Sequence, residues 1–108
     1  MDPQVCMIQL MDLSGIDSQF RADLETAIRY LLSKGCSEVY LFGSLGIGTN
    51  RKSSDIDIAV RGIAPEQFFP VYGELMTQLG HRVDLVDLDL QADFGRVLLE
   101  TGSLRRVA

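Results

Sequence analysis

The sequence predicts a small α/β domain in which helices pack on a mixed β-sheet. The chain has 108 residues, the size of one domain, and 46% of them are apolar, enough for a modest core. Short runs rich in β-branched and aromatic residues alternate with longer segments whose apolar residues recur at helical spacing. No repeat or linker divides the chain, so we expect a single domain over residues 1–108 with its core at about 17–102.

The first predicted helix begins at Asp17 or Ser18, residue types that cap helix N-termini. Lys34 suits its last turn, and Gly35 suits the position just after it. The apolar segment 5–13 before this helix fits either a strand or a helix. The apolar positions of the helix keep helical spacing: Phe20, Leu24, Ala27, Ile28, Leu31 and Leu32.

Three strands are predicted at residues 38–42, 55–60 and 82–88. The turn region 43–54 between the first two is at the lower length limit for a crossover between parallel strands, and it has no helical pattern. We therefore expect a mixed sheet and not a purely parallel one.

A second helix is expected to open at Pro65, because proline is well suited to the first helical position. Pro70 and Gly73 predict that its first half is kinked or broken. A last short helix is expected at 92–100, ended by Gly102. The predicted buried stripe of the second helix consists of Phe69, Tyr72, Leu75, Met76 and Leu79.

Composition narrows the classes of partner. The net charge of −5 weighs against DNA or RNA as the main partner, because nucleic-acid binders usually carry a basic face. It does not weigh against a nucleotide whose charge Mg²⁺ screens.

The two cysteines, Cys6 and Cys36, are too few for a disulfide framework, and we interpret both as reduced structural residues. The chain shows neither a signal peptide nor an apolar run of about 20 residues, so we expect a cytoplasmic protein without a membrane span.

A glycine-rich turn follows the first strand. Gly43, Gly46 and Gly48 permit positive φ and close backbone approach, and such turns form anion-binding nests. Ser44 adds a hydroxyl donor. The turn therefore predicts a phosphate-binding site.

Spacing excludes three other motifs at this turn. A P-loop needs lysine where Thr49 stands. A dinucleotide fingerprint that used the last two glycines of the turn needs a third glycine where Arg51 stands. A nucleophile elbow at Ser44 needs glycine where Phe42 stands.

Two carboxylates lie at the start of the second strand. Asp55 and Asp57 are two residues apart and therefore point to the same face of a strand. Carboxylate oxygens on a rigid strand suit Mg²⁺, which takes substrate phosphate oxygens as further ligands. An Asp-x-Asp pair alone fits a turn residue followed by a solvent-facing one, but the glycine-rich turn before it favours a metal site.

Asp84 is the expected third carboxylate, since an acid between apolar neighbours in mid-strand is costly unless it is paired or bound to metal. Three carboxylates could hold two metal ions, and the third is the natural base for an attacking hydroxyl. Asp87 and Asp89 lie at the strand end and are expected to cap the next helix. His81, the only histidine, is interpreted as structural.

With these residues the chain resembles the minimal nucleotidyltransferases of the DNA polymerase β-like superfamily, over about residues 17–102. The resemblance implies a nucleotidyltransferase fold and transfer of a nucleoside monophosphate, AMP from ATP, to a hydroxyl with one or two Mg²⁺ ions. It implies that Asp55, Asp57 and Asp84 are the catalytic and metal-binding residues. The residues that it implies for nucleotide binding are Gly43, Ser44, Gly48 and Ser54. Arg51 and Lys52 bring positive charge beside the metal strand, and a contact with phosphate and a solvated loop fit them equally well.

The resemblance also implies a partner. Small stand-alone members act as antitoxins beside a helical ribonuclease toxin of the HEPN type, can adenylylate a tyrosine on it, and form hetero- or homo-oligomers. Leu45 and Ile47 depart from the family, because many members carry arginine at one or both positions. This departure leaves a second hypothesis open, an antitoxin that neutralises its partner by occlusion with little or no catalysis. A transferase for small molecules such as aminoglycosides is less favoured, because those enzymes usually add a second domain.

Overall fold

The computed structural model describes residues 13–43 and 55–108. Its centre is a four-stranded sheet in the order β3-β2-β1-β4. Strand β1 runs antiparallel to β2 and β4, and β2 runs parallel to β3, so the expected mixed sheet is confirmed. The strands are β1 (Glu38–Phe42), β2 (Ile56–Arg61), β3 (Val83–Asp87) and β4 (Arg105–Arg106).

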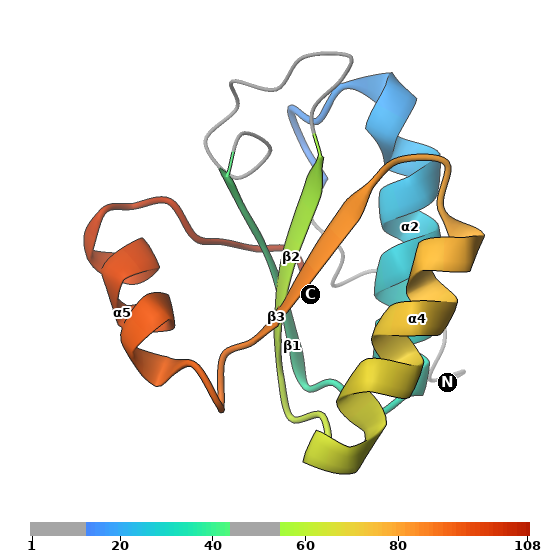
Figure 1. Ribbon diagram of the computed structural model, residues 1–108. Helices are drawn as coiled ribbons and strands as arrows, with labels where there is room; N and C mark the ends of the chain where they lie inside the picture. The colour runs from blue at the N-terminus through green and yellow to red at the C-terminus, as the bar shows by residue number, and fades with distance from the viewer. Residues whose placement is uncertain (1–12, 44–54) are drawn as a thin grey trace, which may run out of the picture.

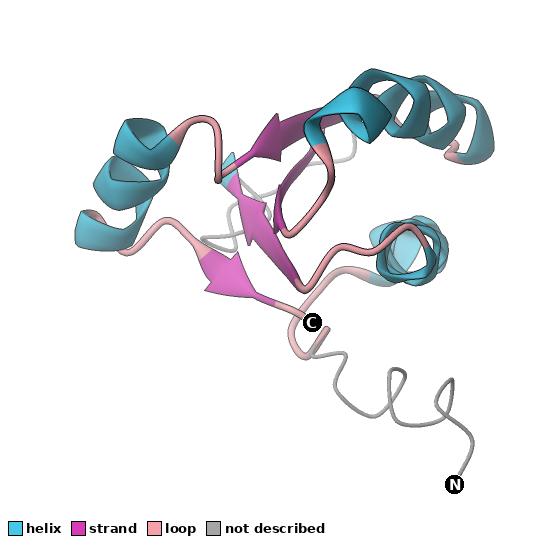
Figure 2. Ribbon diagram, turned by 90° about the horizontal axis from the view of Figure 1, so that it is seen from below, coloured by secondary structure: helices cyan, strands magenta, loops and turns pink. Residues whose placement is uncertain are grey.

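Helices lie on both faces of this sheet (Figures 1 and 2). Helices α2 (Ser18–Ser33) and α4 (Phe68–Gln78) cover one face, and α5 (Ala92–Glu100) lies on the other side. None of the helices in the described part of the chain is long and apolar enough to cross a bilayer. The core lies between the sheet and the first two helices, and its largest fully buried side chains include Phe20, Leu24, Ile28, Leu31, Leu41, Ile56, Ile58 and Leu75.

Helix α2 begins and ends as predicted. The Asp17 carboxylate accepts a hydrogen bond from the Gln19 N–H at 3.1 Å, which satisfies one of the free donors at the N-terminus. At the other end Lys34 is the C-cap and Gly35 has a φ of 98°, a conformation that glycine adopts without strain.

The start of the second helix differs from the prediction. Pro65 opens a short 3₁₀ turn (Pro65–Gln67), and α4 then runs unbroken through Pro70 and Gly73. Pro70 lies in the first turn of α4, where its missing N–H has no intrahelical partner to lose.

The buried stripe of α4 is also shifted. Phe69 and Met76 are 79% and 58% exposed, so their predicted burial is wrong. Leu75 is buried as predicted, and Tyr72 and Leu79 are partly buried against the core. Val71, which the sequence does not place in the stripe, is buried as well. Starting the helix at Phe68 turns a different set of positions toward the sheet, and a helical pattern that is apolar on several sides does not determine which side faces the core.

The last residues form an element that has no sequence signal. Val107 and Ala108 are buried, and the Ala108 carbonyl accepts a hydrogen bond from the Val39 N–H at 3.0 Å. Strand β4 has two residues, too few for any periodicity.

The expected capping role of Asp87 and Asp89 is wrong. The N-cap of α5 is Gln91, without a side-chain capping bond. The Asp87 carboxylate instead accepts from the Asp89 N–H at 3.0 Å, and Asp89 accepts from the Gly62 N–H at 2.8 Å. Both acids stabilise the turns at this end of the sheet, because a carboxylate can satisfy backbone N–H groups that no ladder reaches.

Cys36 is a buried free thiol, as the sequence predicts. Burial, and secondarily the negative charge of Asp87, raises the pKa of the thiol to about 11. Because the thiolate is the nucleophile, the folded protein holds Cys36 in an unreactive form.

We expect Cys36 to react with a disulfide reagent at pH 8 only after unfolding. Cys6 lies outside the described residues, so the measurement uses a Cys6→Ser variant. It follows the release of the reagent's own thiol, which accompanies each reaction with Cys36, with and without denaturant. Labelling of the folded variant within minutes would show that the thiol is neither buried nor protonated.

Candidate active site

Two of the predicted carboxylates meet at neighbouring positions of the sheet. Asp57 on β2 and Asp84 on β3 are partners in the parallel pairing, so both side chains point to the same face. Their neighbours Ile56, Ile58 and Leu85 point into the core on the opposite face. This alternation fixes the acids on the face turned away from α2 and α4.

The two acids interact directly. Burial and then the negative charge of Asp84 raise the pKa of the Asp57 carboxyl to about 6. A hydrogen bond to Asp84 and the charge of Asp55 also contribute. A hydrogen bond between two carboxyl groups needs a proton, so the pair retains one where isolated aspartates are ionised. The site concentrates negative charge and favours a cation.

Gly43 places the start of the glycine-rich turn against this pair. Its φ is 64°, and a Cβ atom added there would collide with the Asp57 carboxylate, with the Cγ atom of Asp57 only 3.1 Å away. Glycine is therefore required both for the backbone conformation and for the close approach of Asp57. The sequence predicts Gly43 as a phosphate contact, and it does not predict this packing against the carboxylate.

The remaining predicted site residues are only partly described. Asp55 is half-buried just before β2 and acts on Asp57 through its charge. Ser44, Gly48, Arg51 and Ser54 lie outside the described residues, as do Leu45 and Ile47. Within residues 13–43 and 55–108, no group of three or more histidine, cysteine, aspartate or glutamate side chains is arranged to hold a metal ion.

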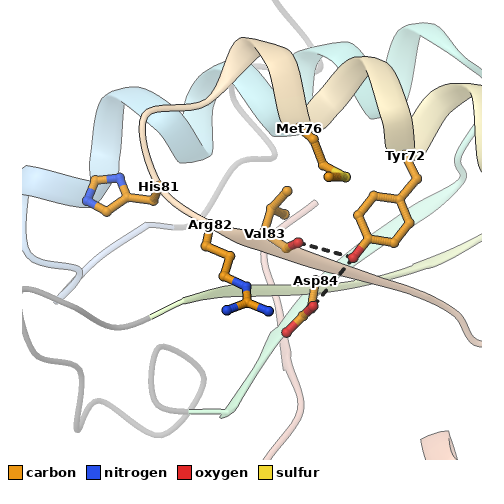
Figure 3. A pocket seen from close by; sticks show the side chains of 6 residues that line it. All are labelled: Tyr72, Met76, His81, Arg82, Val83 and Asp84. Atoms are coloured by element: carbon orange, nitrogen blue, oxygen red, sulfur yellow. Dashed lines mark hydrogen bonds between the residues drawn. The ribbon is translucent and has the colours of Figure 1, made fainter.

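The structure places a tyrosine, Tyr72, next to Asp84, and the site predicted from the sequence does not include this residue. Figure 3 shows the hydroxyl of Tyr72 between the Val83 carbonyl and the Asp84 carboxylate. The hydroxyl oxygen lies 3.1 Å from the carbonyl and 3.4 Å from Oδ1 of Asp84. The sequence assigns Tyr72 only to a buried stripe. One feature of the sequence could have indicated this role: a tyrosine in a predicted buried stripe needs a polar partner for its hydroxyl.

His81 has the structural role that the sequence predicts. Its Nδ1 lies 2.7 Å from Oδ2 of Asp23, which also accepts from the Gly80 N–H at 2.9 Å. The imidazole packs on the Phe20 ring, with ring centroids 4.5 Å apart. These contacts tie α2 to the segment before β3.

The mixed sheet with helices on both faces is the polymerase β-like nucleotidyltransferase fold. A family model for polymerase beta nucleotidyltransferases matches residues 25–104, and the chain belongs to this family.

Solved structures agree with this assignment. A toxin–antitoxin structure with AMP-PNP is 28% identical over 78% of this chain and 71% of its own, with a TM-score of 0.62. A mutant of the toxin–antitoxin MntA–HpeT is 26% identical over the same shares, with a TM-score of 0.61. A third, named "Structure of putative minimal nucleotidyltransferase", is 25% identical over 88% of this chain and 98% of its own, with a TM-score of 0.64. No curated protein matches the chain.

Proposed function

We propose that this protein transfers AMP from ATP to a tyrosine hydroxyl of a toxin partner and so acts as an antitoxin. The observation that carries the proposal is the Asp57–Asp84 pair on adjoining strands, with the Gly43 turn packed against it. The similarity to two toxin–antitoxin structures, one with AMP-PNP, supports it. The mutant structure among them replaces two aspartates by glutamate at positions two residues apart, the spacing of Asp55 and Asp57.

In this proposal Asp55, Asp57 and Asp84 hold Mg²⁺. The chemistry of the donors fits, because oxygen ligands suit this ion and because burial, and then the negative charge of Asp84, raise the pKa of Asp57. The three carboxylates are not arranged around one point in the described residues, so they would have to close on the ion when it binds. Bound Mg²⁺ would supply charge neutralisation for the triphosphate and for the leaving pyrophosphate.

The backbone at Gly43 and the turn residues Ser44, Gly48, Ser54 and Arg51 bind the triphosphate in this proposal. Backbone N–H groups of a glycine turn can donate to phosphate oxygens, and an arginine adds a bidentate donor. Their task is to hold the α-phosphorus in line with the incoming hydroxyl.

Asp84 acts as the general base. The acceptor oxygen forms a bond to the α-phosphorus, the bond from that phosphorus to the bridging oxygen breaks, and pyrophosphate leaves with the electron pair. The hydroxyl proton passes to an oxygen of Asp84, the more exposed member of the pair.

The partner is a helical toxin of the HEPN type in this proposal. An exposed apolar surface on and just before α5 supports a protein partner: Leu90, Phe94, Val97 and Leu99 are 66%, 39%, 54% and 58% exposed. Several exposed apolar side chains on one short segment favour contact with another protein.

The test incubates the protein with labelled ATP, Mg²⁺ and the product of the neighbouring gene. We expect AMP on a tyrosine of that partner, and at least a roughly 100-fold lower rate for Asp55→Asn, because a missing metal ligand costs transition-state stabilisation. Glu25→Gln, a change at an exposed acid on α2 and away from α5, is the control. Absence of label with the wild-type protein, under conditions where a related enzyme labels its partner, contradicts the proposal.

Neutralisation by occlusion is the second candidate, and the exposed surface of α5 favours it. In that case the double variant Asp55→Asn/Asp57→Asn still co-purifies with the toxin and neutralises it. A double variant that binds normally and fails to neutralise excludes occlusion alone.

A further inference from the structure

A pocket of about 220 Å³ opens at the outer edge of β3, beside Asp84. Its lining residues are Tyr72, Met76, His81, Arg82, Val83 and Asp84. Figure 3 shows Tyr72 and Met76 reaching down from α4, while Arg82 and Asp84 extend from the strand segment on the other side. The pocket thus combines apolar, cationic and carboxylate groups in one place.

Strand geometry explains why Asp84 is accessible from this pocket. The Ile56 N–H donates to the Arg82 carbonyl at 2.7 Å, so the carbonyl of the next residue, Val83, points away from β2. Tyr72 occupies that free edge by donating to the Val83 carbonyl, and the same hydroxyl lies 3.4 Å from Asp84. Asp84 therefore lies between Asp57 on its inner side and Tyr72 on its outer side.

Arg82 and Met76 give the pocket its binding chemistry. Among the described residues, the exposed guanidinium of Arg82 has neither a hydrogen bond nor an ion pair. A guanidinium without a partner among the described residues, in a chain with a net charge of −5, is a site for a carboxylate. Met76 is 58% exposed at one turn from Tyr72, and a thioether beside an aromatic ring favours a further aromatic group.

We infer that this pocket receives the acceptor: a tyrosine side chain on a protein segment with a carboxylate next to that tyrosine. The inference rests on the proposed function and assigns its acceptor site. The ring contacts Met76 and Tyr72, the neighbouring carboxylate binds Arg82, and the phenolic hydroxyl faces Asp84. The phenolic oxygen then bonds to the α-phosphorus of ATP, its proton passes to Asp84, and pyrophosphate leaves. Tyr72 is a positioning residue, because its single hydroxyl proton is shared between the Val83 carbonyl and Oδ1 of Asp84 and so favours one orientation of that carboxylate.

The first test uses synthetic peptides with one tyrosine between two glutamates or between two lysines. We expect wild-type protein to transfer AMP faster to the glutamate peptide. Arg82→Ala should raise KM for that peptide at least about fivefold, the usual size of one lost ion pair, and leave KM for ATP unchanged. Arg29→Ala, at an exposed arginine on α2, is the matched control and should leave both values unchanged.

The second test separates positioning from binding. Tyr72→Phe keeps the ring, so we expect an unchanged KM for the peptide and a kcat lowered about five- to tenfold, as expected for one lost hydrogen bond. Tyr72→Ala should also raise KM. Tyr30→Phe is the matched control, because Tyr30 likewise donates to a carboxylate, that of Glu74 at 3.1 Å, away from Asp84. An unchanged kcat for Tyr72→Phe overturns the positioning role.

A binding measurement distinguishes failure of this inference from failure of the proposed function. Fluorescence anisotropy follows the labelled glutamate peptide in the presence of Mg²⁺ and α,β-methylene ATP, which cannot transfer AMP. Affinity that falls in Arg82→Ala without any transfer from ATP supports the pocket and rejects the reaction. Transfer by wild type with KM and affinity unchanged in Arg82→Ala supports the reaction and overturns the acceptor site. Absence of both transfer and Arg82-dependent binding overturns both.

Discussion

Gly43→Ala is expected to lower the rate of nucleotidyl transfer roughly 100-fold while the protein still folds. The new methyl group would occupy the position of the Asp57 carboxylate, so Asp57 must move or the turn must open. Either change moves a metal-binding acid or the phosphate-binding backbone by about 1 Å, and displacements of this size cost roughly 100-fold in rate. The measurement is the rate of AMP transfer together with the free energy of unfolding.

Gly15→Ala is the matched control for this change. Gly15 has a φ of 77°, similar to that of Gly43, but an added Cβ atom meets nothing within 4 Å. Both variants should lose about 1 kcal/mol of stability from the left-handed backbone. Only Gly43→Ala should lose activity. Equal activity in the two variants would show that the packing of Gly43 against Asp57 has no part in catalysis.

The sequence predicts much of the fold because its signals are local. The cap at Asp17, the glycine after the first helix and the alternation around Asp57 each depend on neighbouring residues, and the structure contains all three. The rotation of α4 and the two-residue strand β4 depend on tertiary packing, which overrides a pattern that is apolar on several sides or too short.

In the candidate site too, the sequence predicts what depends on neighbouring residues and does not predict what depends on tertiary packing. Spacing alone indicates that Asp55 and Asp57 share a face, but only the parallel pairing of β2 with β3 brings Asp57 beside Asp84. Strand order is a long-range property, so the sequence predicts three acids without their contacts. The hydroxyl of Tyr72 reaches Asp84 because β3 is an edge strand, and the sequence has no signal for an edge.

Asp57→Asn is expected to stabilise the protein without metal at neutral pH and to abolish transfer. The pKa of Asp57 is raised to about 6 in the folded state, against about 4 for an unfolded aspartate. The folded state therefore binds more protons than the unfolded state between pH 4 and 6, and stability falls as pH rises through this window. The asparagine variant has no charge to lose there.

The comparison of wild type with Asp57→Asn isolates this contribution from the other acids. At pH 4 the two proteins should be about equally stable, because Asp57 is then protonated. At pH 7 the variant should be more stable by about 1 kcal/mol, a value reduced for solvent screening of a half-exposed pair. Asp84→Asn should give a smaller gain, because it removes the repulsion and leaves Asp57 buried. The two changes should be less than additive, because both remove that repulsion.

Binding of Mg²⁺ should stabilise the wild-type protein, the opposite of the effect of raising the pH. A cation between the carboxylates removes the repulsion, so millimolar Mg²⁺ should raise the Tm of the wild-type protein and suppress its loss of stability between pH 4 and 6. Asp57→Asn should respond weakly, since it lacks one of the anionic ligands. Asp93→Asn, which changes an exposed acid on α5, should respond to pH and Mg²⁺ as the wild type does. If the stability of wild type and of Asp57→Asn depended on pH in the same way, the charge of Asp57 would not destabilise the folded state. An equal Mg²⁺ response in both would place the cation elsewhere.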